Sequence, residues 1–258
     1  MLYRRFSKST GNDPPGRLQC VNRRQRNLMQ TEGNMANTVA VIIADIKDSK
    51  KMKERERYEW QLFLKSAIVQ VNENWAADIE APFMITKGDE FQGVVANVPR
   101  VHSIMIEFER LLHPLGLRYG IGLGAIQRMG ANIPIEMDGP AFHRANAALN
   151  YAKKNRLRVN FRSTDQQLDL YINTVYTLMY AIKKRWSTIT FKRYWRYKEL
   201  GTYHKVADLE GVSPQAVWDS LRNAHATDVI AAEEAVMNFL ATKMVALGAD
   251  EADDQSPG

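Results

Sequence analysis

The order in which the hydrophobic periodicity changes along the chain is the feature that most restricts its fold. A short β-branched run at residues 39–44 predicts a buried strand, and residues 54–75 then carry apolar side chains at helical spacing. The turn at residues 87–90 joins two strand-like segments into a hairpin, and Pro99 opens a second helix. The first half therefore begins as strand, helix, hairpin and helix.

The same alternation continues to about residue 162. A strand at residues 117–124, with glycines along one face, precedes a helix at residues 140–155 and a strand at residues 157–161. The order β-α-β-β-α-β, extended by one helix and one strand, is that of a ferredoxin-like or palm core. We therefore predict an α+β fold for this half.

The second half predicts helices only. Thr164 is expected to cap an apolar helix, a basic and aromatic stretch follows at residues 183–205, and a last helix spans residues 228–244. The chain then divides into a leader, a palm domain, an all-α helix-turn-helix domain and an acidic tail, at residues 1–35, 36–163, 164–246 and 247–258.

The two ends of the chain predict disorder. Residues 1–34 hold seven basic residues against Asp13 and Glu32, without apolar periodicity. Because Met35 directly precedes the first strand, the leader is consistent with a mis-called start codon. The alternative is a basic arm that grips nucleic acid.

The composition is that of a globular protein. The chain has 258 residues, of which 45% are hydrophobic and 25% charged, enough apolar mass for a core. No run approaches the roughly 18 apolar residues that a membrane span requires. A single cysteine, Cys20, cannot form a disulfide framework. We therefore expect a cytoplasmic protein that has no membrane partner.

Two carboxylates are predicted to meet at one end of the sheet. In a β-α-β-β-α-β sheet the third strand lies antiparallel beside the first, which makes Asp45 and Asp89 neighbours. Two adjacent carboxylates repel each other unless a cation or a shared proton lies between them. Oxygen ligands without nearby histidine or cysteine suit Mg²⁺ or Mn²⁺. The alternative for each residue is an ordinary turn or capping aspartate.

A magnesium site of this kind implies a nucleoside triphosphate or another nucleotide, because Mg²⁺ usually keeps waters and phosphate oxygens as ligands. Gly88 allows a phosphate to approach the hairpin closely. The predicted nucleotide-binding residues follow the first strand or lie in the hairpin turn: Ser49, Lys50, Lys51, Lys87 and Gly88.

Several motifs carry a family resemblance. VIIADIKDS and FMITKGDEFQGVV resemble the metal-binding strand and hairpin of class III nucleotidyl cyclases and GGDEF diguanylate cyclases. DGPAFHRA, GDEFQGVV and the helix-turn-helix pattern together resemble the SatD family over about residues 38–245. The resemblance implies metal ligands at Asp45 and Asp89, a backbone carbonyl ligand at Ile46, a further acidic ligand at Glu90, and a homodimer.

Two departures from active cyclases bear on catalysis. The position of the base-reading lysine is Ile85, and the positions of the asparagine and arginine that stabilise the transition state are His143 and Ala147. The clamp on the developing phosphoryl charge is therefore missing or rebuilt. His143 and Arg144 are the candidate catalytic residues.

Residues 205–221 have the pattern of a helix-turn-helix. Val206 and Ala207 pack the first helix, Gly211 takes the turn, and Val217 and Leu221 face inward. The predicted DNA-binding residues lie on the second helix and in the preceding basic stretch: Ser213, Gln215, Ala216, Arg222, Lys192, Arg193 and Arg196. The alternative is a helical hairpin for dimerisation or for docking on the palm.

Three functional hypotheses follow. In the first, the palm binds Mg²⁺ and a nucleotide without turnover and biases a DNA-binding half, as in a regulator of transcription or signalling. In the second, the palm is an active nucleotidyl cyclase or nucleotidyltransferase, and the helical half serves dimerisation or targeting. In the third, the acidic pair binds nothing. The missing transition-state residues favour the first hypothesis over the second.

Overall fold

A five-stranded mixed sheet forms the centre of the first half. The computed structural model describes residues 38–128 and 134–254, so the leader and the last four residues lie outside the described part. The strands follow the order β2-β3-β1-β4-β7, and β7 pairs parallel to β4 while the other pairs are antiparallel. They are β1 (Val39–Ile46), β2 (Ile79–Lys87), β3 (Glu90–Val95), β4 (Leu117–Gly124) and β7 (Val159–Arg162). The predicted mixed α+β fold is confirmed.

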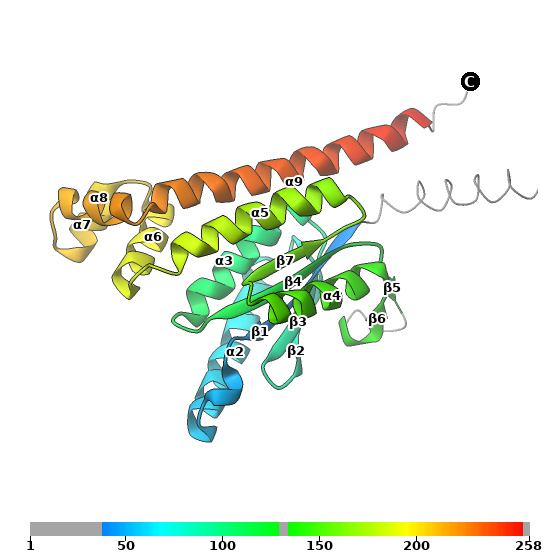
Figure 1. Ribbon diagram of the computed structural model, residues 1–258, viewed down its shortest axis with the longest axis horizontal. Helices are drawn as coiled ribbons and strands as arrows, with labels where there is room; N and C mark the ends of the chain where they lie inside the picture. Colours follow the sequence, from blue (N-terminus) through cyan, green and yellow to red (C-terminus); the bar gives the residue numbers. More distant parts are fainter. Residues whose placement is uncertain (1–37, 129–133, 255–258) are drawn as a thin grey trace, which may run out of the picture.

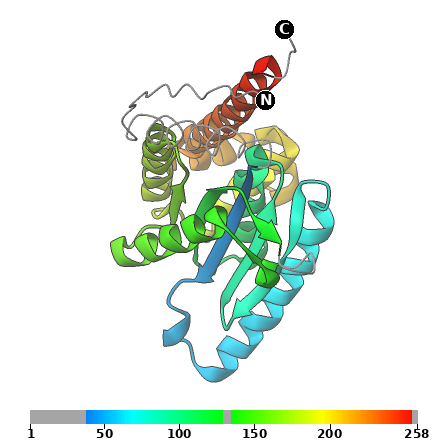
Figure 2. The same cartoon turned by 90° about the vertical axis from the view of Figure 1, so that its right-hand side faces the viewer.

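The two faces of the sheet are covered by different helices. Alternate residues of β1 belong to two hydrophobic clusters, since Ala40 and Ile42 pack with α2 (Glu54–Asn74) and α3 (Val101–Leu112), whereas Val41 and Ile43 pack with α4 (Pro140–Asn155). Figure 2 shows α2 and α4 on opposite sides of the sheet. Shorter elements complete this half: η1 (Ser49–Lys51), η2 (Val98–Arg100), β5 (Gln127–Arg128), η3 (Pro134–Glu136) and β6 (Met137–Asp138).

Two glycines bring α4 into contact with the backbone of β4. A Cβ atom at Gly122 would lie 2.1 Å from the carbonyl oxygen of Ala141, and one at Gly120 would lie 2.3 Å from that of Ala145. The glycine face predicted for this strand is therefore the surface on which α4 lies. Because the N-terminal turns of α4 cover the end of β4, its C-terminal turns lie over the start of β4 and the end of β1.

The second half consists of helices in the described part of the chain. These are α5 (Gln166–Lys183), α6 (Thr188–Leu200), α7 (Tyr203–Glu210), α8 (Pro214–Asn223) and α9 (Ala226–Asp254). The long helices α5 and α9 run side by side above the sheet, and α6 to α8 gather at one end (Figure 1). The buried apolar residues of this half belong to the same hydrophobic cluster as the residues on the α2–α3 face of the sheet.

Two details of the helical half differ from the sequence expectation. The N-cap of α5 is Asp165 rather than Thr164, because the Asp165 carboxylate accepts the backbone N–H groups of Gln167 and Leu168. The last helix starts at Ala226 and continues to Asp254, past the predicted end at Met244, through a segment that contains no proline to stop it. None of the described helices is long and apolar enough to cross a membrane.

We predict that Gly122→Ala lowers the free energy of unfolding by about 2 to 3 kcal/mol, because the added Cβ would overlap the α4 backbone. Gly201→Ala is the matched control: Gly201 has φ +77° but nothing within 4 Å of the added atom, so it should cost only about 1 kcal/mol. Urea unfolding measures both values. A Gly122→Ala protein as stable as wild type would contradict the close approach.

Candidate functional site

The predicted acidic edge lies where β1 ends. Asp45 is directly opposite Glu90 on β3 and Arg118 on β4, so these three side chains share the face of the sheet that α4 covers. Asp89 lies one residue earlier, in the turn with Gly88, whose φ is +63°. The cross-strand partner of Asp45 is therefore Glu90.

Two cations neutralise the two opposing carboxylates. The Lys153 Nζ atom lies 3.2 Å from Asp45 Oδ2 and 3.3 Å from Glu90 Oε2, and Arg118 Nη1 lies 3.3 Å from Asp45 Oδ2. Asp45 is only 8% exposed, so its carboxylate requires such partners. We call Asp45, Glu90, Arg118 and Lys153 the sheet-end cluster.

Lys153 was not among the site residues predicted from the sequence, although the helical spacing contains a signal for it. Ala145 and Leu149 pack against the sheet, and Lys153 follows Leu149 by four residues, so it lies on the same face of α4. Arg118 was likewise not among the site residues predicted from the sequence. Its role depends on the register that places it opposite Asp45.

The sheet-end cluster offers two carboxylates to a cation. In residues 38–128 and 134–254, no group of three or more histidine, cysteine, aspartate or glutamate side chains could hold a metal. Asp45 and Glu90 nevertheless direct their oxygens at one cationic group, Lys153. Two carboxylates fit a Mg²⁺ ion that takes its remaining ligands from water and phosphate. Ile46, the predicted carbonyl ligand, is the last residue of β1.

The predicted phosphate-holding segment follows directly after β1. Ser49, Lys50 and Lys51 form the short helix η1, in which Ser49 is 9% exposed. The Lys51 Nζ atom lies 2.8 Å from Asp48 Oδ1, and the hydrogen bond from Lys51 holds the pKa of Asp48 below its usual value. Lys87 is exposed at the hairpin turn.

The candidate catalytic residues lie at the other end of α4. His143 is exposed, with Nε2 3.5 Å from Asp138 Oδ1, and Arg144 donates to the carbonyl oxygen of Leu123 at 2.6 Å. Lys153 follows Arg144 by nine positions along the helix, a rise of about 13 Å. Within one chain, His143 and Arg144 therefore do not join the sheet-end cluster.

The helices α7 and α8 form a compact pair. Val206, Ala207, Val217 and Leu221 are buried, as expected from the sequence, and Gly211 takes the turn with φ +65°. Four of the predicted DNA-binding residues are exposed on or next to α8: Ser213, Gln215, Ala216 and Arg222. The Arg222 guanidinium lies 4.6 Å from the centre of the Trp218 ring, which holds it on that surface.

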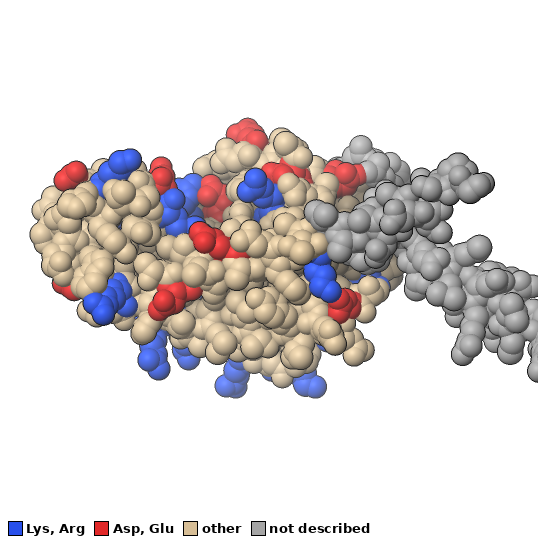
Figure 3. Space-filling model, turned by 90° about the horizontal axis from the view of Figure 1, so that it is seen from above, with Lys and Arg blue, Asp and Glu red and all other residues tan. Residues whose placement is uncertain are grey.

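Two other predicted DNA-binding residues make internal ion pairs. Arg193 Nε lies 2.8 Å from Glu210 Oε2, and Arg196 Nη1 lies 2.7 Å from Glu210 Oε1. Burial alone would raise the pKa of Glu210, but the hydrogen bonds from Arg193 and Arg196 outweigh it and lower that pKa. These arginines join α6 to the α7–α8 pair. Lys192 is exposed. On the face of the molecule shown in Figure 3, acidic and basic side chains are interspersed.

The chain is similar to proteins of one described family. The family model described as SatD family matches residues 39–234. The crystal structure of the catalytic core of a rhodopsin-guanylyl cyclase with converted specificity, in complex with ATPalphaS, aligns with 44% of this chain and 72% of its own at 16% identity and a TM-score of 0.35. No curated protein sequence matches the chain.

We predict that Lys153→Met destabilises the protein by about 1 kcal/mol, because it leaves Glu90 and the buried Asp45 with one cation fewer. Lys154→Met is the matched control, since Lys154 is exposed on the same helix and should change the free energy of unfolding by less than about 0.5 kcal/mol. Denaturant titration compares the two. Equal stabilities would show that Lys153 contributes nothing to the cluster.

Proposed function

The chain belongs to the SatD family, and we propose that it is a nucleotide-responsive regulator. In this proposal the sheet-end cluster binds a nucleotide with Mg²⁺, and the helical half responds and contacts DNA through α8. The observation that carries the proposal is the convergence of two carboxylates and two cations at the end of β1, next to the segment 47–51.

The charges of the cluster favour a magnesium–nucleotide complex over either component alone. Asp45 and Glu90 would hold the metal ion, which would neutralise phosphate charge. Lys153 and Arg118, which now pair with those carboxylates, would then be free to bind phosphate oxygens. Mg²⁺ alone would have to displace Lys153, and phosphate alone would leave the buried Asp45 unpaired.

Binding without turnover agrees best with the arrangement of α4. His143 and Arg144 lie at the opposite end of this helix from Lys153, and Ile85 replaces the lysine by which cyclases read the base. A chain of this kind would bind a nucleotide as a signal.

The helical half has short routes to the sheet end. The strand β7 leads into α5 through Ser163 to Asp165, and α5 carries Lys183, which lies 3.0 Å from Glu109 of α3 and 3.7 Å from Glu233 of α9. A nucleotide alters DNA affinity only if it binds two states of the protein differently. These contacts connect the helical half to the first half, so a change in one half could be transmitted to the other.

We predict that a nucleoside triphosphate with Mg²⁺ raises the melting temperature, because a ligand of the folded state stabilises it by mass action. Asp45→Asn and Glu90→Gln should each abolish this increment, and Mg²⁺ without nucleotide should produce none. Asp89→Asn is the matched control, since Asp89 lies outside the cluster, and it should retain most of the increment. Thermal melting with each nucleotide measures the effect; equal increments in all four proteins would contradict the site.

We predict that the full chain binds DNA with an affinity that falls steeply as salt is raised, because lysine and arginine displace counterions from the phosphates. Arg222→Ala should reduce the preference between DNA sequences, whereas Arg193→Ala should mainly lower the stability of the protein, because Arg193 is bound to Glu210.

A nucleotide with Mg²⁺ should change DNA affinity by roughly 5- to 150-fold in wild type but not in Asp45→Asn.

Fluorescence anisotropy at several salt concentrations, with mass spectrometry of the nucleotide, measures these outcomes. No DNA retention at low salt would reject the DNA-binding part of the proposal. A cyclic or oligomeric nucleotide product that disappears in Asp45→Asn would identify an enzyme in place of a nucleotide sensor.

A further inference from the structure

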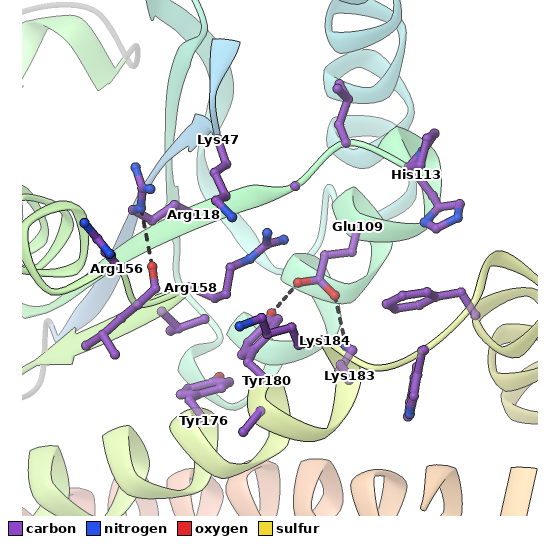
Figure 4. A pocket seen from close by; sticks show the side chains of 18 of the residues that line it. Lys47, Glu109, His113, Arg118, Arg156, Arg158, Tyr176, Tyr180, Lys183 and Lys184 are labelled. Atoms are coloured by element: carbon purple, nitrogen blue, oxygen red, sulfur yellow. Dashed lines mark hydrogen bonds and ion pairs between the residues drawn. The ribbon is translucent and has the colours of Figure 1, made fainter. Parts of the chain in front are cut away.

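A cavity of about 840 Å³ lies between the sheet end and the helical half. The segments after β1, before β4 and before β7 form one side, and α5 and α6 form the other (Figure 4). Its volume is within the range of small-molecule sites. We call it the junction cavity. It shares Arg118 with the sheet-end cluster but does not include Asp45, Glu90 or Lys153.

The lining of the junction cavity is strongly basic. Its two acidic residues are already paired: Asp48 with Lys51 at 2.8 Å, and Glu109 with Lys183 at 3.0 Å. Arg156, Arg158 and Lys184 also line the cavity, and no carboxylate of the described residues lies within ion-pair distance of them. Gathering unpaired cations around one cavity costs Coulomb energy, which an anion would recover.

Arg158 forms no ion pair with the described residues, although its charge helps to lower the pKa of Glu109. Its guanidinium carbon lies 5.7 Å from the centre of the Tyr180 ring, and a Cβ atom at Gly116 would come within 2.5 Å of its Nη1 atom. The Nε atom of Arg158 is buried and has no hydrogen-bond partner among the described residues. A buried donor without an acceptor is unfavourable. Arg158 is therefore positioned beside the cavity with unused hydrogen-bonding capacity.

Arg156 has an uncommon backbone conformation. It is the C-cap of α4 with φ 57° and ψ 30°, a left-handed conformation that glycine or asparagine usually takes at this position. A larger side chain there stores strain, and such strain concentrates at functional sites. Figure 4 shows Arg156 at one side of the junction cavity, near Arg118.

The other side of the junction cavity is aromatic. The His113 ring centre lies 5.1 Å from those of Phe191 and Trp195. Burial, with a contribution from Lys192, lowers the pKa of His113, which favours its neutral ring. The atoms His113 Nε2 and Trp195 Nε1 are buried, and neither has a hydrogen-bond partner in the part of the chain that the structure describes. Figure 4 shows His113 on the side away from Arg156.

We propose that the junction cavity binds a small organic anion that carries two or more phosphate groups. Its phosphates contact Arg156, Arg158 and Lys184, and its uncharged part lies against His113, Phe191 and Trp195. Arginine and lysine are the usual partners of phosphate oxygens, and flat aromatic side chains contact apolar or ring-shaped groups. This site adjoins the proposed sheet-end site, with which it shares Arg118 and part of the segment 47–51, but it does not include the carboxylates of Asp45 and Glu90 and requires no metal ion.

The test is a thermal titration of the full chain with sodium tripolyphosphate, at constant ionic strength and with EDTA to remove divalent metals. The melting temperature of wild type should rise to saturation. Arg156→Gly should weaken the affinity about tenfold or more, the loss expected for a charged hydrogen bond. Without ligand the same variant should be at least as stable as wild type, because glycine relieves the left-handed strain. Lys154→Gln, which removes an exposed charge from the same helix, should keep the wild-type affinity.

A second arm tests the aromatic side. Adenosine triphosphate in EDTA should bind more tightly than tripolyphosphate, and Trp195→Phe should keep most of that advantage while Trp195→Ala loses it. Equal affinities for the two anions would overturn the assignment of the aromatic side.

The variants separate this site from the sheet-end cluster. Lys153→Met should keep the tripolyphosphate response in EDTA, whatever it does to nucleotide binding with Mg²⁺. A response lost in Lys153→Met but unchanged in Arg156→Gly would locate the phosphates at the sheet-end cluster and overturn the proposal. No saturable response, or equal responses in Arg156→Gly, Arg158→Gln and wild type, would also overturn it.

Discussion

A buried charge network that links Glu233, Lys183 and Glu109 joins the helical half to α3 of the first half. Glu233 of α9 is 1% exposed, and its carboxylate lies 2.6 Å from Lys198 of α6 and 3.7 Å from Lys183 of α5, which in turn binds Glu109 of α3. Burial would raise the pKa of Glu233, but His102 and the two lysines outweigh it and lower that pKa. The resulting stability is present at neutral pH and declines as the pH falls below the pKa of the unfolded carboxyl group. Breaking such a buried pair costs several kcal/mol, far more than breaking a surface pair.

The packing of helices against the sheet positions the residues of both proposed sites. The glycine face of β4 brings α4 close enough for Lys153 to reach Asp45 and Glu90, and the helices above the sheet close the junction cavity over Arg158. Both proposed sites therefore lie at the same end of β1. In our proposals, the sheet-end cluster would exchange its internal cations for a magnesium–nucleotide complex, and the junction cavity would take a metal-free phosphate compound. A ligand in the junction cavity would alter the charge beside Lys183 and Glu109, which line it.

The spacing of apolar residues and glycines in the sequence predicted the strands, the helices and the residues that face the core. The apolar run of β1, the glycines of β4 and the buried Val206, Ala207, Val217 and Leu221 were all readable from spacing. The pairing of Asp45 with Glu90 depends on strand register, and the roles of Lys153 and Arg118 depend on how α4 lies on the sheet. Arg193 and Arg196 were predicted to contact DNA because their charge is visible in the sequence, whereas their partner Glu210 is brought near only by folding. The junction cavity combines residues from distant segments, which no local pattern records.

We propose that a nucleotide bound at the sheet end changes the structure or dynamics of the helical half. Hydrogen–deuterium exchange of the full chain, with and without a nucleoside triphosphate and Mg²⁺, tests it most directly. Slower exchange is expected in residues 46–51 and, in the same titration, altered exchange in α5, α8 and the first turns of α9. Asp45→Asn should lose both effects. Protection confined to residues 46–51, with the amides of α5, α8 and α9 unchanged at saturating nucleotide, would contradict the account.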